Sequence, residues 1–333
     1  MGRSRKKLSD QPFELDIDSL DAKGLGLAAV GEKNLRVFDA LPGEKVVARH
    51  LFGRKNRGRA ETLEVLDPSP DRVKPLCPSF GNCGACSLQH LSMDAQLSRK
   101  QNALLKLLSE SGSVAPIEVY PPLDSPHWNY RRKARLSVRD VVAKGRVLIG
   151  FRERDGRFVA DMEECHILHE LAAEALPKLS ELLGELDCRS SIPQIEVACG
   201  DECCALIIRH LHDLSDSDIG SLQDFASETG LGIFLQAGGP DSIKLLAPVD
   251  FQLEYEFKPL GLSFRFDPLD FIQVNGALNL QMVTRALELL DPQPGDRVLD
   301  LFCGLGNFTL QLARRAGQVT GLEGSQEMVE RAR

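Results

Sequence analysis

The stretch RVLDLFCGLGNFTLQLARRAGQVTGLEGS, residues 297–325, decides the fold of the C-terminal part of the chain. Its apolar start predicts a strand, and the glycine-rich turn at 304–306 precedes a helical run. A second apolar run ends in an acidic residue, Glu323. A strand, a glycine turn, a helix and a second strand in this order open a doubly wound α/β domain.

The glycine turn also has the features of a site for an adenosyl ligand. Glycines let a backbone approach a ligand closely, and a helix N-terminus offers free N–H donors. The dinucleotide fingerprint requires a third glycine where this chain has Thr309. Glu323 could accept hydrogen bonds from both ribose hydroxyls. The pattern resembles the S-adenosylmethionine site of class I methyltransferases, with a purely structural turn as the alternative. We expect Cys303 to pack as a small apolar residue rather than to act as a nucleophile.

Three cysteines lie close together in CPSFGNCGACSLQH, residues 77–90: Cys77, Cys83 and Cys86. A fourth, Cys165, follows far downstream in DMEECHIL. Three thiolates on one loop and one distant thiolate favour a [4Fe–4S] cluster. A zinc site, which more often uses paired C-x-x-C knuckles, and plain buried thiols remain open at this point. We assign the other four cysteines outside the glycine turn to packing: Cys188, Cys199, Cys203 and Cys204.

Length and composition exclude several classes of protein. The 333 residues suffice for two or three domains. No run of about 18 apolar residues predicts a membrane span. The N-terminus MGRSRKKLSD is basic but lacks the apolar region of a secretory signal. We therefore expect a cytoplasmic protein, not bound to a membrane, whose clustered cysteines bind metal rather than form disulfides.

Charge is distributed unevenly along the chain. The net charge is −8, but residues 1–160 hold 28 Lys and Arg against 19 Asp and Glu, whereas residues 161–333 hold 12 against 29. This asymmetry favours a polyanionic partner for the front half, with solvated surface charge as the alternative. The candidate RNA-binding segments are FGRKNRGR (52–59) and YRRKARLSV (130–138). In the second, strand alternation predicts Arg131, Lys133 and Arg135 on one face and Arg132 on the other.

The pattern of short strands, helices and turns predicts a multidomain α/β protein. A basic tail (1–10) precedes a small OB-like β-barrel (11–68), as short strand-like runs between glycine and proline turns indicate. A central α+β domain with the cysteine loop follows (69–265). Its helix at 94–111 is a candidate to pack on the last domain, the start of a Rossmann-like methyltransferase domain (266–333).

Five segments in this order resemble the bacterial RNA (uracil-5-)-methyltransferases, and the resemblance covers nearly the whole chain from about residue 13. They are CPSFGNCGACSLQH, YRRKARLSV, GFRERDGRFVADMEEC, FIQVN (271–275) and DLFCGLGNFTL. The N-terminal barrel resembles a TRAM module, which binds RNA. Together with the cluster, this resemblance implies the branch of the family that acts on 23S ribosomal RNA.

The resemblance also implies which residues bind the cofactors. The ligands of the [4Fe–4S] cluster are Cys77, Cys83, Cys86 and Cys165. The contacts to S-adenosylmethionine are Gln273, Phe302, Gly304, Asn307 and Glu323. "CGAC" stands where many relatives have "CGGC", which leaves the thiols in place.

The family's chemistry, as the resemblance implies it, is covalent. A cysteine thiolate adds to C6 of uracil, C5 takes the sulfonium methyl group, and a general base removes the C5 proton. The target base must be unstacked to reach the site. The family's catalytic cysteine and base lie near the C-terminus of its members. We therefore expect this sequence, which ends at Arg333, to be truncated, to lack both residues and to be inactive.

Two alternative functions differ from C5 methylation of 23S ribosomal RNA. One is methylation of another ribosomal or transfer RNA uridine, against which the N-terminal barrel argues. The other is a non-catalytic, RNA-binding iron–sulfur protein. In each case we expect a monomer.

Overall fold

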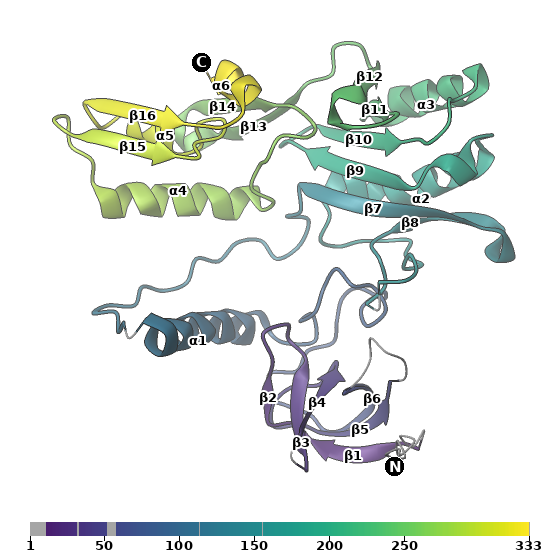
Figure 1. The fold of residues 1–333 in the computed structure, drawn as a ribbon, viewed down its shortest axis with the longest axis vertical. Helices are drawn as coiled ribbons and strands as arrows, with labels where there is room; N and C mark the ends of the chain where they lie inside the picture. The colour runs from purple at the N-terminus through teal and green to yellow at the C-terminus, as the bar shows by residue number, and fades with distance from the viewer. Residues whose placement is uncertain (1–10, 32, 52–57, 113, 155, 333) are drawn as a thin grey trace, which may run out of the picture. The chain divides into compact units, whose positions relative to one another are not determined.

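The structure is a computed structural model that describes residues 11–31, 33–51, 58–112, 114–154 and 156–332. The chain forms two compact units: unit 1 comprises residues 1–122 and 152–160, and unit 2 comprises residues 123–151 and 161–333. Figure 1 shows the elements of both. The basic tail predicted at 1–10 lies outside the described residues, and the domain boundaries predicted from the sequence stay predictions.

Unit 1 contains a six-stranded sheet with a small core of its own. Alternate residues of its strands are buried, as Val46 and Ala48 illustrate. These pack with Ile17, Leu35 and Val37. Neighbouring strands are antiparallel except for one parallel pair, β4 and β6. In sheet order the strands are β1 (Phe13–Asp16), β5 (Lys45–His50), β6 (Arg59–Asp67), β4 (Lys33–Phe38), β3 (Gly26–Val30) and β2 (Ser19–Leu20).

The strands expected between Phe13 and Leu66 are thus present, and the cysteine loop follows them. After the loop, α1 (Met93–Gly112) confirms the helix expected at 94–111. Among the described residues none of α1 is buried, and Leu104 and Leu107 are more than half exposed. That α1 packs on the methyltransferase domain stays a prediction, as does the identification of the sheet as a TRAM module.

Unit 2 is built on a six-stranded mixed sheet. The helix α2 (Glu170–Glu185) packs on β8, and α3 (Asp216–Thr229) packs on β11 and β12. Strands and helices alternate along this part of the chain, as the predicted α+β organisation requires. In sheet order the strands are β12 (Ile243–Ala247), β11 (Gly232–Gln236), β10 (Cys204–Arg209), β9 (Gln194–Cys199), β7 (Lys133–Val141) and β8 (Arg146–Gly150).

The C-terminal part of unit 2 begins with a hairpin that sequence reasoning missed. Its strands β13 (Leu253–Phe257) and β14 (Leu262–Phe266) precede α4 (Gly276–Leu290). Two parallel strands follow with a short helix between them, as expected: β15 (Arg297–Leu301), α5 (Thr309–Leu312) and β16 (Gln318–Leu322). The last helix is α6 (Gln326–Ala332), and the short 3₁₀ helices are η2 (Val142–Lys144), η3 (Arg189–Ser191), η4 (Pro240–Ser242) and η5 (Lys258–Leu260).

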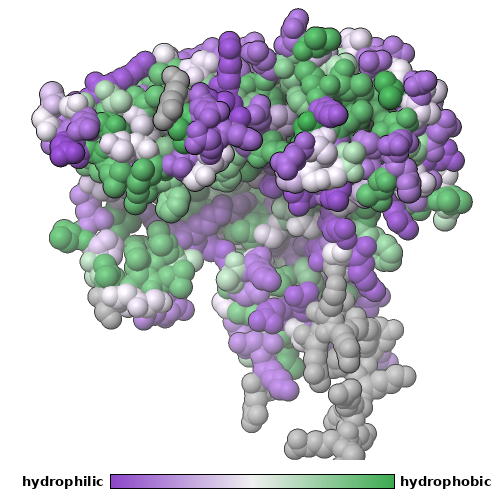
Figure 2. Space-filling model, turned by 45° about the horizontal axis from the view of Figure 1, so that its top comes forward, coloured by the Kyte–Doolittle hydropathy of each residue, from purple (hydrophilic) through white to green (hydrophobic). Residues whose placement is uncertain are grey.

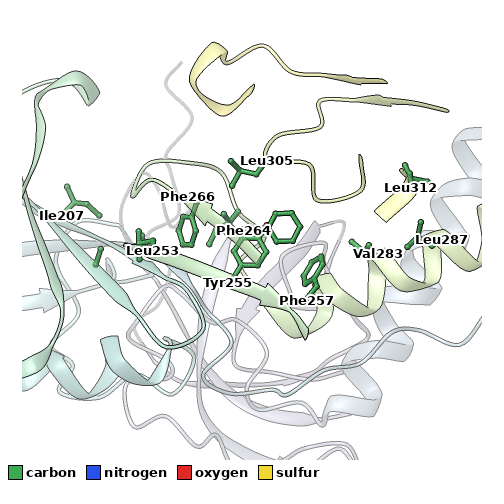
Figure 3. Close-up of a cluster of buried hydrophobic side chains, with 13 residues drawn as sticks. Ile207, Leu253, Tyr255, Phe257, Phe264, Phe266, Val283, Leu287, Leu305 and Leu312 are labelled. Carbon is green, nitrogen blue, oxygen red and sulfur yellow. The ribbon is translucent and has the colours of Figure 1, made fainter. Parts of the chain in front are cut away.

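An aromatic core joins these C-terminal elements to the central sheet. The rings of Tyr255 and Phe264 are stacked, with centroids 4.8 Å apart and planes 10° apart. Figure 3 shows them among other aromatic residues of the hairpin, with Val283 and Leu287 of α4 nearby. Ala205 and Ile207 of β10 belong to the same buried cluster. The core therefore fixes α4, and with it the glycine turn, against the central sheet.

Apolar side chains also remain on the surface of unit 2. Leu299, Leu301 and Leu322 of the β15–β16 pair are each more than half exposed. The β15–β16 pair thus exposes apolar side chains. Hydrophobic residues reach the surface in several patches between hydrophilic ones (Figure 2). Within the described ranges no helix is both long and apolar enough to cross a bilayer.

Candidate functional site

The glycine turn between β15 and α5 has an unusual backbone. Gly304 and Gly306 have φ angles of 54° and 91°, which glycine adopts without steric cost. Phe302 has a φ of 61°, a conformation that is uncommon for a large side chain. Its ring is 89% exposed. Backbone strain of this kind is typical of functional sites. Here the strained residue carries an aromatic ring that is exposed beside the glycine turn.

Glu323 and Gly304, two of the predicted cofactor contacts, are in direct contact. The Glu323 carboxylate accepts hydrogen bonds from the backbone N–H groups of Gly304 (2.9 Å), Gly324 (2.7 Å) and Ser325 (3.0 Å). These bonds, that from Ser325 foremost, hold the pKa of Glu323 below its usual value. The structure therefore places an ionised carboxylate beside the glycine turn.

Asn307, a third predicted contact, is paired with a residue that sequence reasoning missed. The side-chain amides of Asn307 and Asn279 hydrogen-bond to each other reciprocally, over 2.9 and 3.0 Å. Asn279 is 5% exposed and shares the buried face of α4 with Val283 and Leu287. The sequence signal that could have identified Asn279 is its position four residues before Val283, on the apolar stripe of the helix.

Gln273 and Cys303 are the other two residues near the turn that the sequence analysis considered. Gln273 is exposed, in the segment before α4, and within the described residues it forms no hydrogen bond with the turn. The segment itself is held by Asn275, which caps α4 and donates to the Ser125 hydroxyl (2.9 Å). Burial raises the pKa of the Cys303 thiol, which disfavours the thiolate. That Cys303 is not the nucleophile stays a prediction.

The predicted cluster ligands lie in both units. Cys77, Cys83 and Cys86 lie on the loop of unit 1, where Cys83 is buried, and Cys165 is buried in unit 2. In the part of the chain that the structure describes, no three His, Cys, Asp or Glu residues are grouped so that they could hold a metal ion. The four-thiolate site therefore stays a prediction.

Two cysteines assigned to packing do more than pack. Cys199 of β9 and Cys204 of β10 are opposite each other in the antiparallel register and form a disulfide. Both are fully buried, so the expected packing holds, and the disulfide between them is a feature that sequence reasoning missed. The physical reason is register, because neighbouring antiparallel strands bring opposed side chains together.

Three charges of the basic segment 130–138 have partners within the protein, and its role in RNA binding stays a prediction. Lys133 donates to the backbone carbonyl of Pro268, and burial lowers its pKa. Arg135 forms an ion pair with Glu196 of the neighbouring strand (2.9 Å), and Arg132 pairs with Asp201. These charges bind partners within unit 2. Of the other predicted segment, FGRKNRGR, residues 52–57 lie outside the described residues.

Comparisons with known proteins identify relatives of this chain. The family model for tRNA (Uracil-5-)-methyltransferase matches residues 92–333. The chain is 46% identical to the 23S rRNA (uracil(1939)-C(5))-methyltransferase RlmD of Alkalilimnicola ehrlichii, and the alignment covers 100% of this chain and 75% of that protein. It is 48% identical to the protein of the same name from Xylella fastidiosa, over 96% of this chain and 73% of the relative. These coverages do not show that the sequence is truncated, so the truncation stays a prediction.

A solved structure has the same fold. The Pyrococcus abyssi tRNA (uracil-54, C5)-methyltransferase, crystallised in complex with S-adenosyl-L-homocysteine, superposes with a TM-score of 0.70 at 21% identity. The match covers 96% of this chain and 75% of that one, and it confirms the methyltransferase fold. The family model spans well over half of the chain, and the relatives extend the match over all of it. The chain therefore belongs to the tRNA (uracil-5-)-methyltransferase family.

Proposed function

We propose that this protein transfers the methyl group of S-adenosylmethionine to C5 of a uracil in 23S ribosomal RNA. The position would correspond to the uracil 1939 that the names of its relatives give. The proposal is supported by relatives 44–48% identical over 96–100% of the chain. The structural observation that carries it is the ionised Glu323 carboxylate bonded to the Gly304 backbone at the end of the neighbouring strand.

The residues around the turn fit an adenosyl cofactor, which supplies the methyl group when bound. In this proposal the Glu323 carboxylate accepts hydrogen bonds from the ribose hydroxyls. The exposed Phe302 ring offers a flat apolar surface to the ligand. Asn307 uses one amide hydrogen and its oxygen toward Asn279, which leaves its second N–H able to donate to the cofactor. Gln273 is the fifth proposed contact, and Gly304 leaves room for the ligand.

We also propose that Cys77, Cys83, Cys86 and Cys165 bind a [4Fe–4S] cluster. Support for this comes from the chemistry of four thiolates at this spacing and from the family resemblance. In the described residues only Cys83 and Cys165 of the four are buried. No step of methyl transfer is assigned to the cluster.

Formation of the C5–methyl bond needs a nucleophile at C6 of the uracil. The raised pKa of Cys303 argues against that role. We propose that the described residues of the glycine turn supply neither the nucleophile nor the general base. The comparisons do not show the expected inactivity, which the experiment below tests directly, and that the protein is a cytoplasmic monomer stays a prediction.

Transfer of labelled methyl groups tests the function and the choice of RNA together. The protein is supplied with labelled S-adenosylmethionine and either unmodified 23S ribosomal RNA or unmodified transfer RNA. Label in 5-methyluridine of the 23S RNA alone supports the proposal. Label in transfer RNA alone would favour the related enzymes, and tight RNA binding without label would favour a non-catalytic protein. Turnover that Cys303→Ser abolishes would reverse the interpretation of Cys303.

A further inference from the structure

Unit 1 contains a cavity of about 190 Å³ at one end of its sheet. Its walls come from the turn after β2, from the sheet at Phe38 and Arg59, from the cysteine loop at Cys86 and Ser87, and from Arg154. Typical small-molecule pockets are larger, roughly 300–1,000 Å³. The volume suits part of a polymer, such as one base or one phosphate group, better than a free nucleotide.

Backbone contacts preform this cavity. The segment of Arg152 and Arg154 is tied to the cysteine loop, because Gly84 N–H donates to the Arg152 carbonyl (2.8 Å) and Arg154 N–H donates to the Asn82 carbonyl (3.0 Å). A Cβ at Gly84 would lie 2.9 Å from the Arg152 oxygen, so only glycine permits this approach. The position of Arg154 is therefore set before any ligand binds.

The cavity has an excess of positive charge. Among the described residues that line it, three are cationic, Lys23, Arg59 and Arg154, and one, Asp39, is acidic. Asp39 already pairs with Arg154 at 2.7 Å. Within the described ranges neither Lys23 nor Arg59 has an ion-pair partner. Two cations are thus available for an anionic group.

In the same cavity two guanidinium groups lie over one aromatic ring. The Arg154 guanidinium lies 4.5 Å from the centroid of the Phe38 ring, and the Arg59 guanidinium lies 5.8 Å from it. Unpaired RNA bases stack on aromatic rings and on arginine planes, and their phosphates bind Lys and Arg. The ring and the guanidinium over it can stack with a base, and the two cations without ion-pair partners can bind its phosphate.

We propose that this cavity receives the base of one unpaired nucleotide of the RNA substrate. The base stacks on the planar groups of Arg154 and Phe38, and the adjacent phosphate is neutralised by Arg59 and Lys23. The inference rests on the proposed function, since it supplies that reaction with a binding subsite in unit 1. Of the residues that this proposal assigns to RNA binding, only Arg59 belongs to one of the two basic segments, where it is the last residue of FGRKNRGR.

Binding of a single-stranded 23S ribosomal RNA fragment to the whole protein tests the cavity. Arg59→Gln is expected to weaken binding about tenfold and to lower the salt dependence by about one counterion. Phe38→Leu is expected to weaken binding by a similar factor with unchanged salt dependence, because it removes a stacking surface and no charge. The matched control is Arg49→Gln, a strand arginine of the same sheet that pairs with Glu61 outside the cavity.

Equal affinities of Arg59→Gln and Arg49→Gln would overturn the proposal. Should Phe38→Leu not fold, which circular dichroism would show, Arg59→Gln still decides the question. A separate arm compares the unchanged protein on transfer RNA. Equal or tighter binding there would count against the proposed choice of 23S RNA, whereas loss of affinity in Arg59→Gln on either RNA would still support the cavity.

Discussion

The carboxylate of Glu323, at the end of β16, accepts a 2.9 Å hydrogen bond from the backbone N–H of Gly304, in the turn after β15. Nineteen positions separate the two residues along the chain. The parallel pairing of the two strands brings their carboxyl ends together, so the turn and the acidic residue meet at one edge. This contact fixes the turn and places a negative charge where an adenosyl ligand would present hydroxyl groups.

Glu323→Gln is expected to change how stability depends on pH. Because the pKa of Glu323 is lowered in the folded state, its ionised form stabilises the fold above the ordinary value of 4.5. That stabilisation is lost as the pH falls through the lowered pKa. The melting temperature of the unchanged protein should exceed that of the variant by about 2–4 °C at pH 7, and the difference should close on acidification. Glu327→Gln, an exposed carboxylate on α6, is the control. A difference that stays constant from pH 7 into the acid range would contradict this account.

Asn279→Leu is expected to destabilise the protein and weaken cofactor binding. The change leaves the Asn307 amide without its partner, which costs about 1–3 kcal/mol of unfolding free energy. It also frees the turn, so the affinity for S-adenosylmethionine should fall, as measured by calorimetry. Gln281→Leu, an amide on the same helix, is the matched control. If both variants bound the cofactor equally well, Asn279 would have no positioning role.

Phe264→Ala should be among the most damaging changes in unit 2. It removes the ring stacked on Tyr255 and opens a cavity in the core that joins α4 to the central sheet. The expected loss is about 3–5 kcal/mol in urea unfolding, followed by the fluorescence of Trp128, the single tryptophan. Phe271→Ala, whose ring is exposed, should change stability by less than about 0.5 kcal/mol. Similar losses in both variants would show that the aromatic core is not what holds α4.

Cysteine substitutions test the proposed iron–sulfur cluster. Protein purified without oxygen should be brown and contain about four irons per chain. Cys165→Ser should lose colour and iron, whereas Cys203→Ser, whose thiol contacts the backbone of Glu254, should keep both. Colourless protein with one equivalent of zinc would exclude the cluster in favour of a zinc site.

Local patterns in the sequence predict much of this fold. The apolar spacing of 94–111 and 277–290 predicts α1 and α4, and the glycine turn between two apolar runs predicts the β15–β16 pair. The helix α3 was missed, although Ser215 and Asp218 form a capping box at its start. The β13–β14 hairpin was missed as well, despite alternating aromatic residues in LEYEF and LSFRF. Both signals were present in the sequence.

Long-range polar pairing could not be predicted in the same way. Arg132 and Asp201 are 69 positions apart, and Lys133 and the Pro268 carbonyl are 135 apart. Asn279 and Asn307 are 28 apart. No local pattern specifies such partners, since they meet only when separate elements pack. The sequence of the basic segment 130–138 therefore did not reveal that Arg132, Lys133 and Arg135 have partners within unit 2.

The most direct test of the proposed function is mass spectrometry of 23S ribosomal RNA from cells that lack the gene. The account predicts that 5-methyluridine disappears at the position corresponding to uracil 1939 and returns when the gene is restored. Other methylated uridines in ribosomal and transfer RNA should be unchanged. Retention of the methyl group at this position in the deleted cells, or its loss from transfer RNA instead, would contradict the account.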